Sequence, residues 1–301
     1  MIGFQDRVAI VTGAGGGLGR EHALLLAGRG AAVVVNDLGG SLHGEGASSS
    51  AADAVVDLIR AEGGVAVSEY SSVSDPMGGE AIVGKAIEEF GRVDIVVNNA
   101  GILRDRTLTN MAWDELHGVL DVHLRGAFYV TRPALVHMKE QGYGRIVMTS
   151  SGSGIFGNFG QSNYGAAKAG LIGFMNVLKL EGARYDIKVN AVAPIARTRM
   201  TEELLGDLAA KLEPASVAPA VAYLCSEACQ LTGEIWSVGG GSVSRVFVAL
   251  ADGYFKHPDR DGLLTIEDVA ANLEAIRSED DYIVPFSAQD EFAKLGPRLL
   301  G

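Results

Sequence analysis

Short, wholly apolar runs alternate along the chain with longer stretches whose apolar residues recur at helical spacing. We expect seven strands, at 8–11, 32–35, 65–67, 93–97, 145–149, 188–192 and 234–238. Helices are expected between them, at 18–29, 51–61, 80–90, 113–139 and 164–184. Strands that are apolar throughout are typical of a sheet covered by helices on both faces. The pattern predicts an α/β fold with a doubly wound, seven-stranded parallel sheet of Rossmann-like form.

The alternation of strands and helices stops near Val243. We therefore expect residues 1–243 to form the main domain and residues 244–301 to form a C-terminal helical extension. One helix is predicted in this extension, at 266–277, with Thr265 as its N-cap. The extension is expected to pack on the main domain or on a partner subunit, because it begins with an apolar set too large to leave in water. This set is Val246, Phe247, Val248, Leu250, Tyr254 and Phe255.

Composition and the ends of the sequence indicate which partners and which cellular compartment to expect. The 301 residues carry a net charge of −12, which disfavours nucleic acid as a partner. No apolar run is long enough to span a membrane. The chain enters its first strand without a charged leader and ends without an organelle signal, so a soluble, cytoplasmic protein is expected.

No metal site is predicted. Two cysteines, Cys225 and Cys229, are too few to hold structural zinc. Residues 257–268 resemble a degenerate EF-hand loop that begins with histidine and ends with aspartate, and a capped turn before the 266–277 helix is the favoured interpretation.

A glycine-rich turn joins the first strand to the first helix. The string TGAGGGLG at 12–19 allows close approach of a pyrophosphate to a helix N-terminus, although a flexible turn is the alternative. Asp37 closes the second strand, 18 positions after Gly19. A carboxylate there accepts hydrogen bonds from both ribose hydroxyls and repels a 2′-phosphate, which favours NAD over NADP. A turn aspartate is the alternative.

Tyr164 and Lys168 are four residues apart at the start of a predicted helix, so they share one face. An ammonium near a phenol favours the phenolate and lowers the tyrosine pKa, as a general acid/base requires. Ser151 follows the fifth strand, where its hydroxyl can bond a substrate oxygen. Alone, a Tyr-x-x-x-Lys pair is weak, because surface helices contain many.

The motifs together resemble the short-chain dehydrogenase/reductase family. TGAGGGLG, NNAG at 98–101, Ser151 and YGAAK at 164–168 match in order and spacing over residues 7–240. The resemblance implies that Tyr164 is the acid/base, that Ser151 orients the substrate and that Lys168 binds the nicotinamide ribose. It also implies an oligomer, a homodimer or homotetramer. The residues that it places around NAD are Gly13, Gly17, Leu18, Gly19, Asp37, Ser71, Ser72, Asn98, Ala100, Tyr164, Lys168, Ile195 and Thr198.

Further strings resemble one branch of this family, the (3R)-hydroxyacyl-CoA dehydrogenase module of peroxisomal multifunctional enzyme type 2. They are NDLGG at 36–40, NNAGILRDR at 98–106, VHLRGAF at 122–128, MTSS at 148–151, GNFGQSNY at 157–164 and RMT at 199–201. This resemblance implies oxidation of a (3R)-hydroxyacyl-CoA with NAD, in lipid metabolism. A hydroxysteroid or sterol side-chain-CoA substrate is the alternative, and a non-catalytic dinucleotide-binding protein is a third.

Two positions depart from the family pattern. His123 stands where the family carries an asparagine of its catalytic tetrad, with a structural histidine as the alternative. Ile195 follows Pro194 where glycine is usual, which weakens the assignment of Thr198. Four arginines, Arg104, Arg106, Arg197 and Arg199, follow two strands and are candidates for CoA phosphates. The alternative is that they pair with neighbours such as Asp105 and Glu202.

Overall fold

The computed structural model describes residues 1–197 and 210–300. It contains two compact units, Met1–Arg245 and Val246–Gly301. The first unit carries the glycine-rich turn, the NNAG segment, Ser151 and the YGAAK segment. Among the described residues, no helix combines the length and the apolar character that a membrane span requires.

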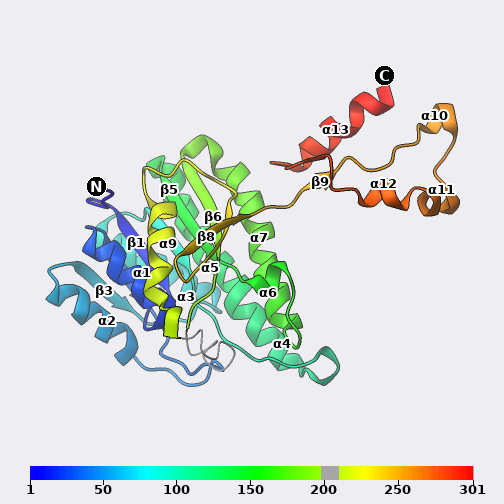
Figure 1. Ribbon diagram of the computed structural model, residues 1–301. Coiled ribbons are helices and arrows are strands. Elements are labelled where there is room, and N and C mark those ends of the chain that lie inside the picture. The colour runs from blue at the N-terminus through cyan, green and yellow to red at the C-terminus, as the bar shows by residue number, and fades with distance from the viewer. Residues whose placement is uncertain (198–209, 301) are drawn as a thin grey trace. The chain divides into compact units, whose positions relative to one another are not determined.

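The first unit is built on one sheet (Figure 1). Its strands run in the order β3-β2-β1-β4-β5-β6-β7-β8, and β1 to β7 pair in parallel. The order reverses between β1 and β4, which is where ligands bind in doubly wound sheets. The strands are β1 (Val8–Thr12), β2 (Ala32–Asn36), β3 (Val65–Glu69), β4 (Ile95–Asn98), β5 (Gly144–Thr149), β6 (Ile187–Pro194), β7 (Ile235–Gly239) and β8 (Ser242–Val246).

The predicted α/β architecture is confirmed, with one correction to the strand count. In the described part of the chain the sheet has eight strands, because β8 follows β7 directly and extends the edge of the sheet. The turn between them places Gly240 and Gly241 at φ of 56° and 83°, a conformation that suits glycine. The sequence of β8, SVSRV, is largely exposed and lacks the continuous apolar run that marks the buried strands.

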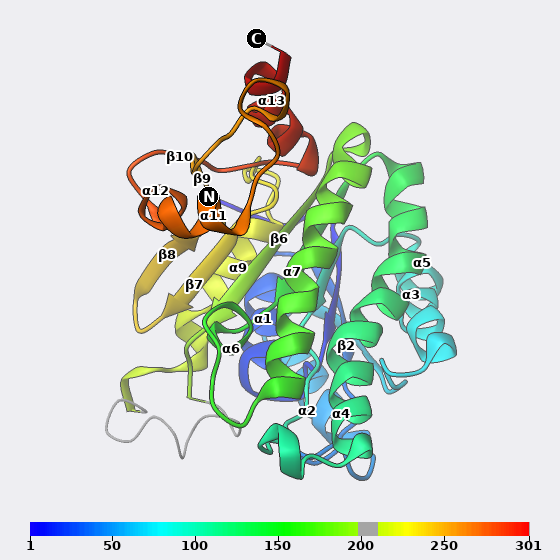
Figure 2. The same ribbon diagram turned by 90° about the vertical axis from the view of Figure 1, so that its right-hand side faces the viewer.

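Helices α1, α2 and α9 cover one face of the sheet, and α3, α5 and α7 cover the other (Figure 2). The helix expected at 113–139 contains a π-helical turn, η2, between α4 and α5, and the backbone stays helical across it. The helices are α1 (Gly17–Gly28), α2 (Ser50–Ala61), α3 (Pro76–Phe90), α4 (Trp113–Leu120), η2 (Asp121–Arg125), α5 (Gly126–Gln141), α6 (Gly152–Ile155), α7 (Ser162–Gly182) and α9 (Ala218–Cys225), with short 3-10 turns at Leu108–Asn110, Ala183–Tyr185 and Pro214–Ser216.

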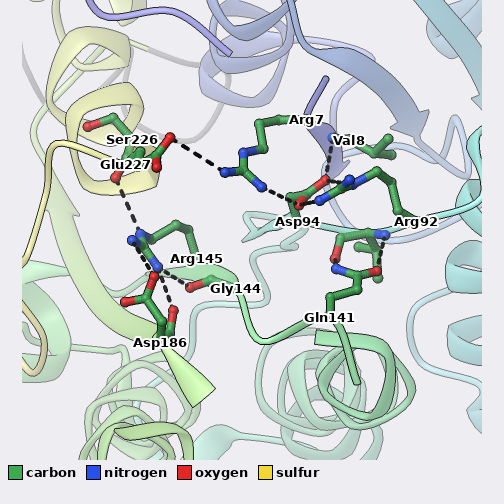
Figure 3. Close-up of polar contacts among 11 residues, drawn as sticks. Arg7, Val8, Arg92, Asp94, Gln141, Gly144, Arg145, Asp186, Ser226 and Glu227 are labelled. Carbon is green, nitrogen blue, oxygen red and sulfur yellow. Dashed lines mark hydrogen bonds and ion pairs between the residues drawn. The ribbon is translucent and has the colours of Figure 1, made fainter. Parts of the chain in front are cut away.

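A polar cluster lies at the amino-terminal end of the sheet, opposite the carboxyl ends of the strands (Figure 3). The fully buried carboxylate of Asp94 accepts hydrogen bonds from Arg7 at 3.1 Å and from Arg92 at 2.6 and 2.7 Å. The guanidinium of Arg145 is also fully buried and contacts the Asp186 carbonyl at 2.6 Å and its carboxylate at 3.3 Å. The buried charges of Asp94 and Arg145 each have an oppositely charged partner, which offsets the cost of removing them from water.

The second unit contains one pair of short strands and several helices. Strands β9 (Leu250–Ala251) and β10 (Tyr282–Ile283) pair antiparallel. The single helix expected at 266–277 is divided at Asn272 into α11 (Ile266–Ala271) and α12 (Leu273–Arg277). Two helices were not expected, α10 (Pro258–Asp261) and α13 (Ala288–Leu300).

The EF-hand-like stretch adopts the capped turn. Thr265 is the N-cap of α11, and its hydroxyl accepts a hydrogen bond from the Asp268 N–H at 3.1 Å. The Asp268 carboxylate in turn bonds Lys256 at 2.5 Å and the Thr265 N–H at 2.9 Å. His257 caps α10 through the Asp259 N–H. Within residues 1–197 and 210–300, no cluster of three or more metal-ligating side chains is present.

Candidate active site

A cleft opens at the carboxyl ends of the strands, beside β1, β2, β4 and β5 and the first turns of α7. It lies at the point where the strand order reverses. Most of the residues predicted from sequence line it together: Gly13, Gly17, Leu18, Asp37, Ser71, Ser72, Ala100, Ser151, Tyr164 and Lys168.

The glycine-rich turn is shaped for an anion. Gly13 has φ of 63°, and a Cβ there would lie 2.7 Å from the Cα of Ala100, so only glycine fits. Gly16 precedes α1 without a side-chain cap, and a Cβ at Gly16 would meet open space. The N–H groups of the first turn therefore face a cleft with room for a phosphate group. This end of the cleft fits the pyrophosphate of a dinucleotide.

Asp37 leaves β2 at the edge of this turn. Its carboxylate accepts hydrogen bonds from the Gly15 N–H at 2.8 Å and the Gly39 N–H at 2.7 Å. The side chain is half-buried and lines the cleft. The carboxylate is thus held in place on two sides, with its negative charge beside the glycine turn.

The NNAG segment fastens β4 to the same turn. The Thr12 hydroxyl accepts from the N–H groups of Asn99 and Ala100 at 3.0 and 3.1 Å. The Asn99 amide donates to the carbonyls of Thr12 and Gly13 at 3.0 and 3.1 Å. Sequence analysis gave Asn99 no role, although it stands inside the NNAG motif. Asn98 does not line the cleft, because its amide donates to the Thr131 hydroxyl at 2.9 Å.

Three other predicted cofactor residues have different positions. Gly19 is buried beneath the turn, where a Cβ would meet the Gly13 carbonyl at 2.2 Å. Ile195 is half-exposed, and its neighbours Pro194 and Ala196 line the cleft instead. Thr198 lies outside the described residues.

Lys168 and Tyr164 project from the first turns of α7. The Lys168 ammonium donates to the Thr149 carbonyl at 2.5 Å, and burial lowers the pKa of Lys168 to about 7. The pKa of Tyr164 is raised above its usual value of 10.0, chiefly by burial. This corrects the expectation that Lys168 lowers it. The ammonium is bound to Thr149 and lies 5.5 Å from the centre of the phenol ring, so burial has the larger effect.

Ser151 joins these residues from the end of β5. Its backbone is the N-cap of α6, and its hydroxyl accepts from the Ser153 N–H at 3.1 Å. A side-chain hydrogen bond between Ser151 and Tyr164 lowers the pKa of the phenol, and so partly offsets the increase that burial causes. The structure thus brings Ser151, Tyr164 and Lys168 to one end of the cleft.

His123 lies in the π-helical turn and is buried. Its Nε2 is 2.8 Å from the Ile102 carbonyl oxygen and 3.0 Å from the Ile102 N–H. A Cβ on Gly101 would meet the imidazole at 2.3 Å, so glycine makes room for the ring. Burial, together with the Lys168 charge, holds the pKa of His123 well below 6.5. The imidazole is therefore neutral at physiological pH.

The three described arginines of the candidate CoA set are paired with carboxylates. Arg104 contacts Asp114 and donates to the His43 carbonyl at 3.0 Å. Arg106 lies 3.4 Å from Glu115, and Arg197 lies 2.6 Å from Glu213. These arginines therefore form ion pairs, as the alternative in the sequence analysis expected. Their partners are Asp114, Glu115 and Glu213, and not the expected Asp105 and Glu202. Arg199 lies outside the described residues.

The two ends of the cleft suit two parts of one reaction. One end offers free N–H groups and a fixed carboxylate to a dinucleotide. The other end brings together a half-buried phenol, the Ser151 hydroxyl and the Lys168 ammonium. Such a set can exchange a proton with an alcohol while a bound dinucleotide exchanges a hydride.

Comparisons with known proteins agree with this arrangement. A family model described as short chain dehydrogenase matches residues 7–208. A Mycobacterium tuberculosis protein named as a short-chain type dehydrogenase/reductase is 54% identical over 278 residues, covering 92% of this chain and 96% of that protein. Peroxisomal multifunctional enzyme type 2 of Drosophila melanogaster is 52% identical over 274 residues, covering 90% of this chain and 45% of the enzyme.

A solved structure agrees as well. The full-length peroxisomal multifunctional enzyme type 2 from Drosophila melanogaster superposes with a TM-score of 0.84 at 41% identity. The superposition covers 99% of this chain and 50% of that one. The chain thus spans about half the length of the multifunctional enzyme whose dehydrogenase module it closely resembles.

Proposed function

The chain belongs to the short-chain dehydrogenase family, and from this premise we propose that it oxidises (3R)-hydroxyacyl-CoA to 3-ketoacyl-CoA with NAD. Family membership makes it an oxidoreductase that acts on a CH–OH group with a nicotinamide cofactor. The observation that carries the proposal is the meeting of Ser151, Tyr164 and Lys168 at one end of a cleft whose other end fits a dinucleotide.

In this proposal each residue of the site has a separate task. Tyr164 accepts the hydroxyl proton of the alcohol, and Ser151 holds the same oxygen through a hydrogen bond. Lys168 anchors the cofactor ribose, and the hydrogen bond from Ser151 favours the phenolate, which burial disfavours. Bound NAD supplies the acceptor for the hydride. The cofactor is held by the 12–19 turn, by Asp37 and by the cleft residues Ser71, Ser72 and Ala100.

The choice of NAD rests on Asp37. Its carboxylate is fixed by the Gly15 and Gly39 N–H groups, so it cannot turn away from a phosphate bound beside it. A 2′-phosphate there would place two negative charges side by side, whereas ribose hydroxyls can donate to the carboxylate. This geometry supports NAD over NADP.

The choice of acyl-CoA rests on the close similarity to the dehydrogenase module of peroxisomal multifunctional enzyme type 2. Among the described candidate arginines, Arg106 has the most exposed side chain, at 61%, compared with 25% for Arg104 and 39% for Arg197. Arg104 is held on both sides by backbone carbonyls. We therefore propose that Arg106, and not Arg104, binds the CoA phosphates.

We also propose that the protein is a homo-oligomer formed through α5 and α7. Phe128 on α5 stacks on Phe174 of α7 with ring centres 3.6 Å apart, yet 44% of the Phe128 surface is exposed. The same two helices also expose Val136, Val177 and Leu180. A second copy would remove this surface from water. Light scattering on the parent and on Phe128→Glu tests this, and a monomeric parent would contradict it.

The substrate is tested by turnover of purified protein with NAD or NADP on a series of 3-hydroxyacyl-CoA thioesters of both configurations and on several hydroxysteroids. We expect NADH production with the (3R)-hydroxyacyl-CoA thioesters. Tyr164→Phe should lower turnover by about 10²–10⁴-fold while NAD still binds. Turnover of hydroxysteroids without turnover of thioesters would favour the steroid alternative. Absence of any turnover, with NAD bound, would favour a non-catalytic dinucleotide-binding protein.

A further inference from the structure

Gln161 is a buried polar residue immediately before α7, three positions ahead of Tyr164. Its amide nitrogen donates to the Asp105 carboxylate at 2.6 Å. Its carbonyl oxygen accepts from the Ser153 hydroxyl at 2.7 Å and from the Asn158 amide at 3.0 Å. A carboxylate only accepts hydrogen bonds, so Asp105 fixes which way the Gln161 amide faces.

The contacts continue from Gln161 to the site. The Ser153 hydroxyl donates to Gln161, and the Ser153 N–H donates to the Ser151 hydroxyl oxygen. The Ser151 hydroxyl therefore receives a hydrogen bond on one side and keeps its own proton for Tyr164 or a substrate oxygen. An unbroken hydrogen-bonded chain thus leads from Asp105 through Gln161 and Ser153 to Ser151.

The same segments are also joined through the backbone. The Arg106 N–H donates to the Gly160 carbonyl at 2.9 Å, and Arg106 and Gln161 form a parallel bridge. The buried Asn163 amide donates to the Arg104 carbonyl at 2.9 Å, while its oxygen accepts from the Tyr164 N–H at 2.8 Å. The segment after β4 is therefore fastened to the turn from which Tyr164 projects.

Three ionisable groups face the Tyr164 phenol from the elements packed against it. Lys168 comes from α7 itself, and His123 from the π-helical turn is held neutral by burial. Asp105, from the segment after β4, raises the pKa of Tyr164 through its negative charge. Asp105 is the anionic member of this group, and Gln161 is the residue that holds its carboxylate.

We propose that Gln161 is a positioning residue, which uses the Asp105 carboxylate to hold Ser151 and Tyr164 in register for the reaction. The proposal rests on the roles given to Ser151 and Tyr164 in the proposed function. Gln161 joins the three segments that carry or border these two residues: α6, which begins after Ser151, the start of α7 and the loop after β4. Loss of its amide would release the Ser153 hydroxyl and the Asp105 carboxylate together.

Variants of Gln161 and Asp105 distinguish the positioning of Ser151 and Tyr164 from the effect of the Asp105 charge. Gln161→Met keeps the side-chain volume at this position and the charge of Asp105, but it removes the hydrogen bonds that Gln161 makes. This variant should lower kcat about ten- to hundredfold, with the KM for NAD unchanged within about twofold. Gln161→Glu places a second carboxylate beside that of Asp105, and the repulsion should lower kcat further than Gln161→Met does. Adding Asp105→Asn to Gln161→Glu exchanges acid and amide, and should restore most of the lost kcat.

Asp105→Asn alone keeps an acceptor for Gln161 but removes the charge, so the pKa of Tyr164 should fall. NMR of ¹³Cζ-labelled tyrosine, with the signal assigned through Tyr164→Phe, measures this without any substrate. The matched control is Asp114→Asn, which removes a carboxylate from the nearby start of α4, where 79% of the side-chain surface is exposed. It should change neither kcat nor the Tyr164 titration.

The outcomes distinguish this inference from the proposed function. An unchanged kcat in Gln161→Met, or no recovery in the Gln161→Glu/Asp105→Asn double variant, would overturn the positioning role. An unchanged Tyr164 titration in Asp105→Asn would overturn the role of the charge. If the parent turns over no 3-hydroxyacyl-CoA, the proposed function fails. In that case the kcat comparisons are made on the alcohol that is turned over, and the substrate-free titration still tests Asp105.

Discussion

The imidazole of His123 meets the phenol ring of Tyr164 edge to face, with ring centres 5.1 Å apart and an interplanar angle of 88°. The same imidazole is held by the backbone of Ile102. His123 therefore links the loop after β4 to the side of the Tyr164 ring. Its neutrality means that the contact is one of packing and ring electrostatics, with no charge involved.

Replacement of His123 should separate its two contacts. His123→Phe keeps an aromatic ring against Tyr164 and loses the hydrogen bond to Ile102, so its Tm should fall while kcat stays near that of the parent. His123→Asn, which restores the residue that the family carries there, loses the ring. Its kcat should fall about two- to tenfold, the equivalent of one aromatic pair. Equal kcat values in the two variants would show that the ring contact does not position Tyr164.

Asp37→Asn should reduce the preference for NAD over NADP. The amide keeps a hydrogen-bond acceptor at this position but removes the negative charge. We expect kcat/KM for NAD to fall about ten- to hundredfold, because hydrogen bonds to charged groups are the stronger ones. The ratio of kcat/KM for the two cofactors, measured with one substrate, is the readout. A parent protein that uses both cofactors equally would contradict the role given to Asp37.

Most of the fold was predictable because strands buried on both faces leave continuous apolar runs. Each of the seven expected strands occurs within about two residues of its predicted bounds. The π-helical turn at Asp121–Arg125 was not predictable, since 113–139 keeps helical periodicity across it. Strand β8 was missed because an edge strand that is exposed lacks the apolar signal. Helix α13 was missed because Gly296 and Pro297 argue against a helix.

The spacing of motifs identified Tyr164, Lys168, Ser151 and Asp37, which meet in one cleft. The supporting contacts could not be read in the same way. Gln161 and Asp105 are 56 positions apart, and each looks like an ordinary polar loop residue until the fold brings them together. The direction of the Tyr164 pKa was also wrong in the sequence analysis, because burial is a property of the folded chain.

His22 should make folding stability depend on pH. It is fully buried in α1, neither ring nitrogen has a partner, and burial lowers its pKa from 6.5 to about 4. Between these values the unfolded chain binds more protons than the folded one, so stability falls as pH drops from about 6.5 toward 4. The full loss amounts to about 3 kcal/mol. Above pH 6.5 this contribution is constant.

Denaturant unfolding of the parent and of His22→Leu from pH 7 to pH 4 measures the effect. The variant should lose much of the pH dependence in this window. Leu26→Ala, one turn further along α1 and equally buried, is the matched control: it should lower stability at every pH and leave the slope unchanged. Parallel curves for the parent and His22→Leu would refute the assignment.

We expect residues 246–301 to be buried against the main domain or against a second subunit. Large apolar side chains of this unit are exposed, including Leu263 at 80%, Ile266 at 84% and Phe292 at 71%. Among its described residues only His257 is buried, so the unit has no core of its own. Such a surface needs a partner to be stable in water.

Truncation after Arg245, the boundary between the two compact units, should therefore yield protein that aggregates, dissociates or melts at a lower temperature. A gentler test is Phe292→Ser on α13, paired with Glu291→Ser at the neighbouring position as its control. Only the Phe292 variant should lower the Tm or the mass measured by light scattering, because it alone removes apolar surface from the interface. Circular dichroism of the isolated 246–301 peptide should show little helix. A truncated chain with the mass and Tm of the parent would show that these residues cover nothing.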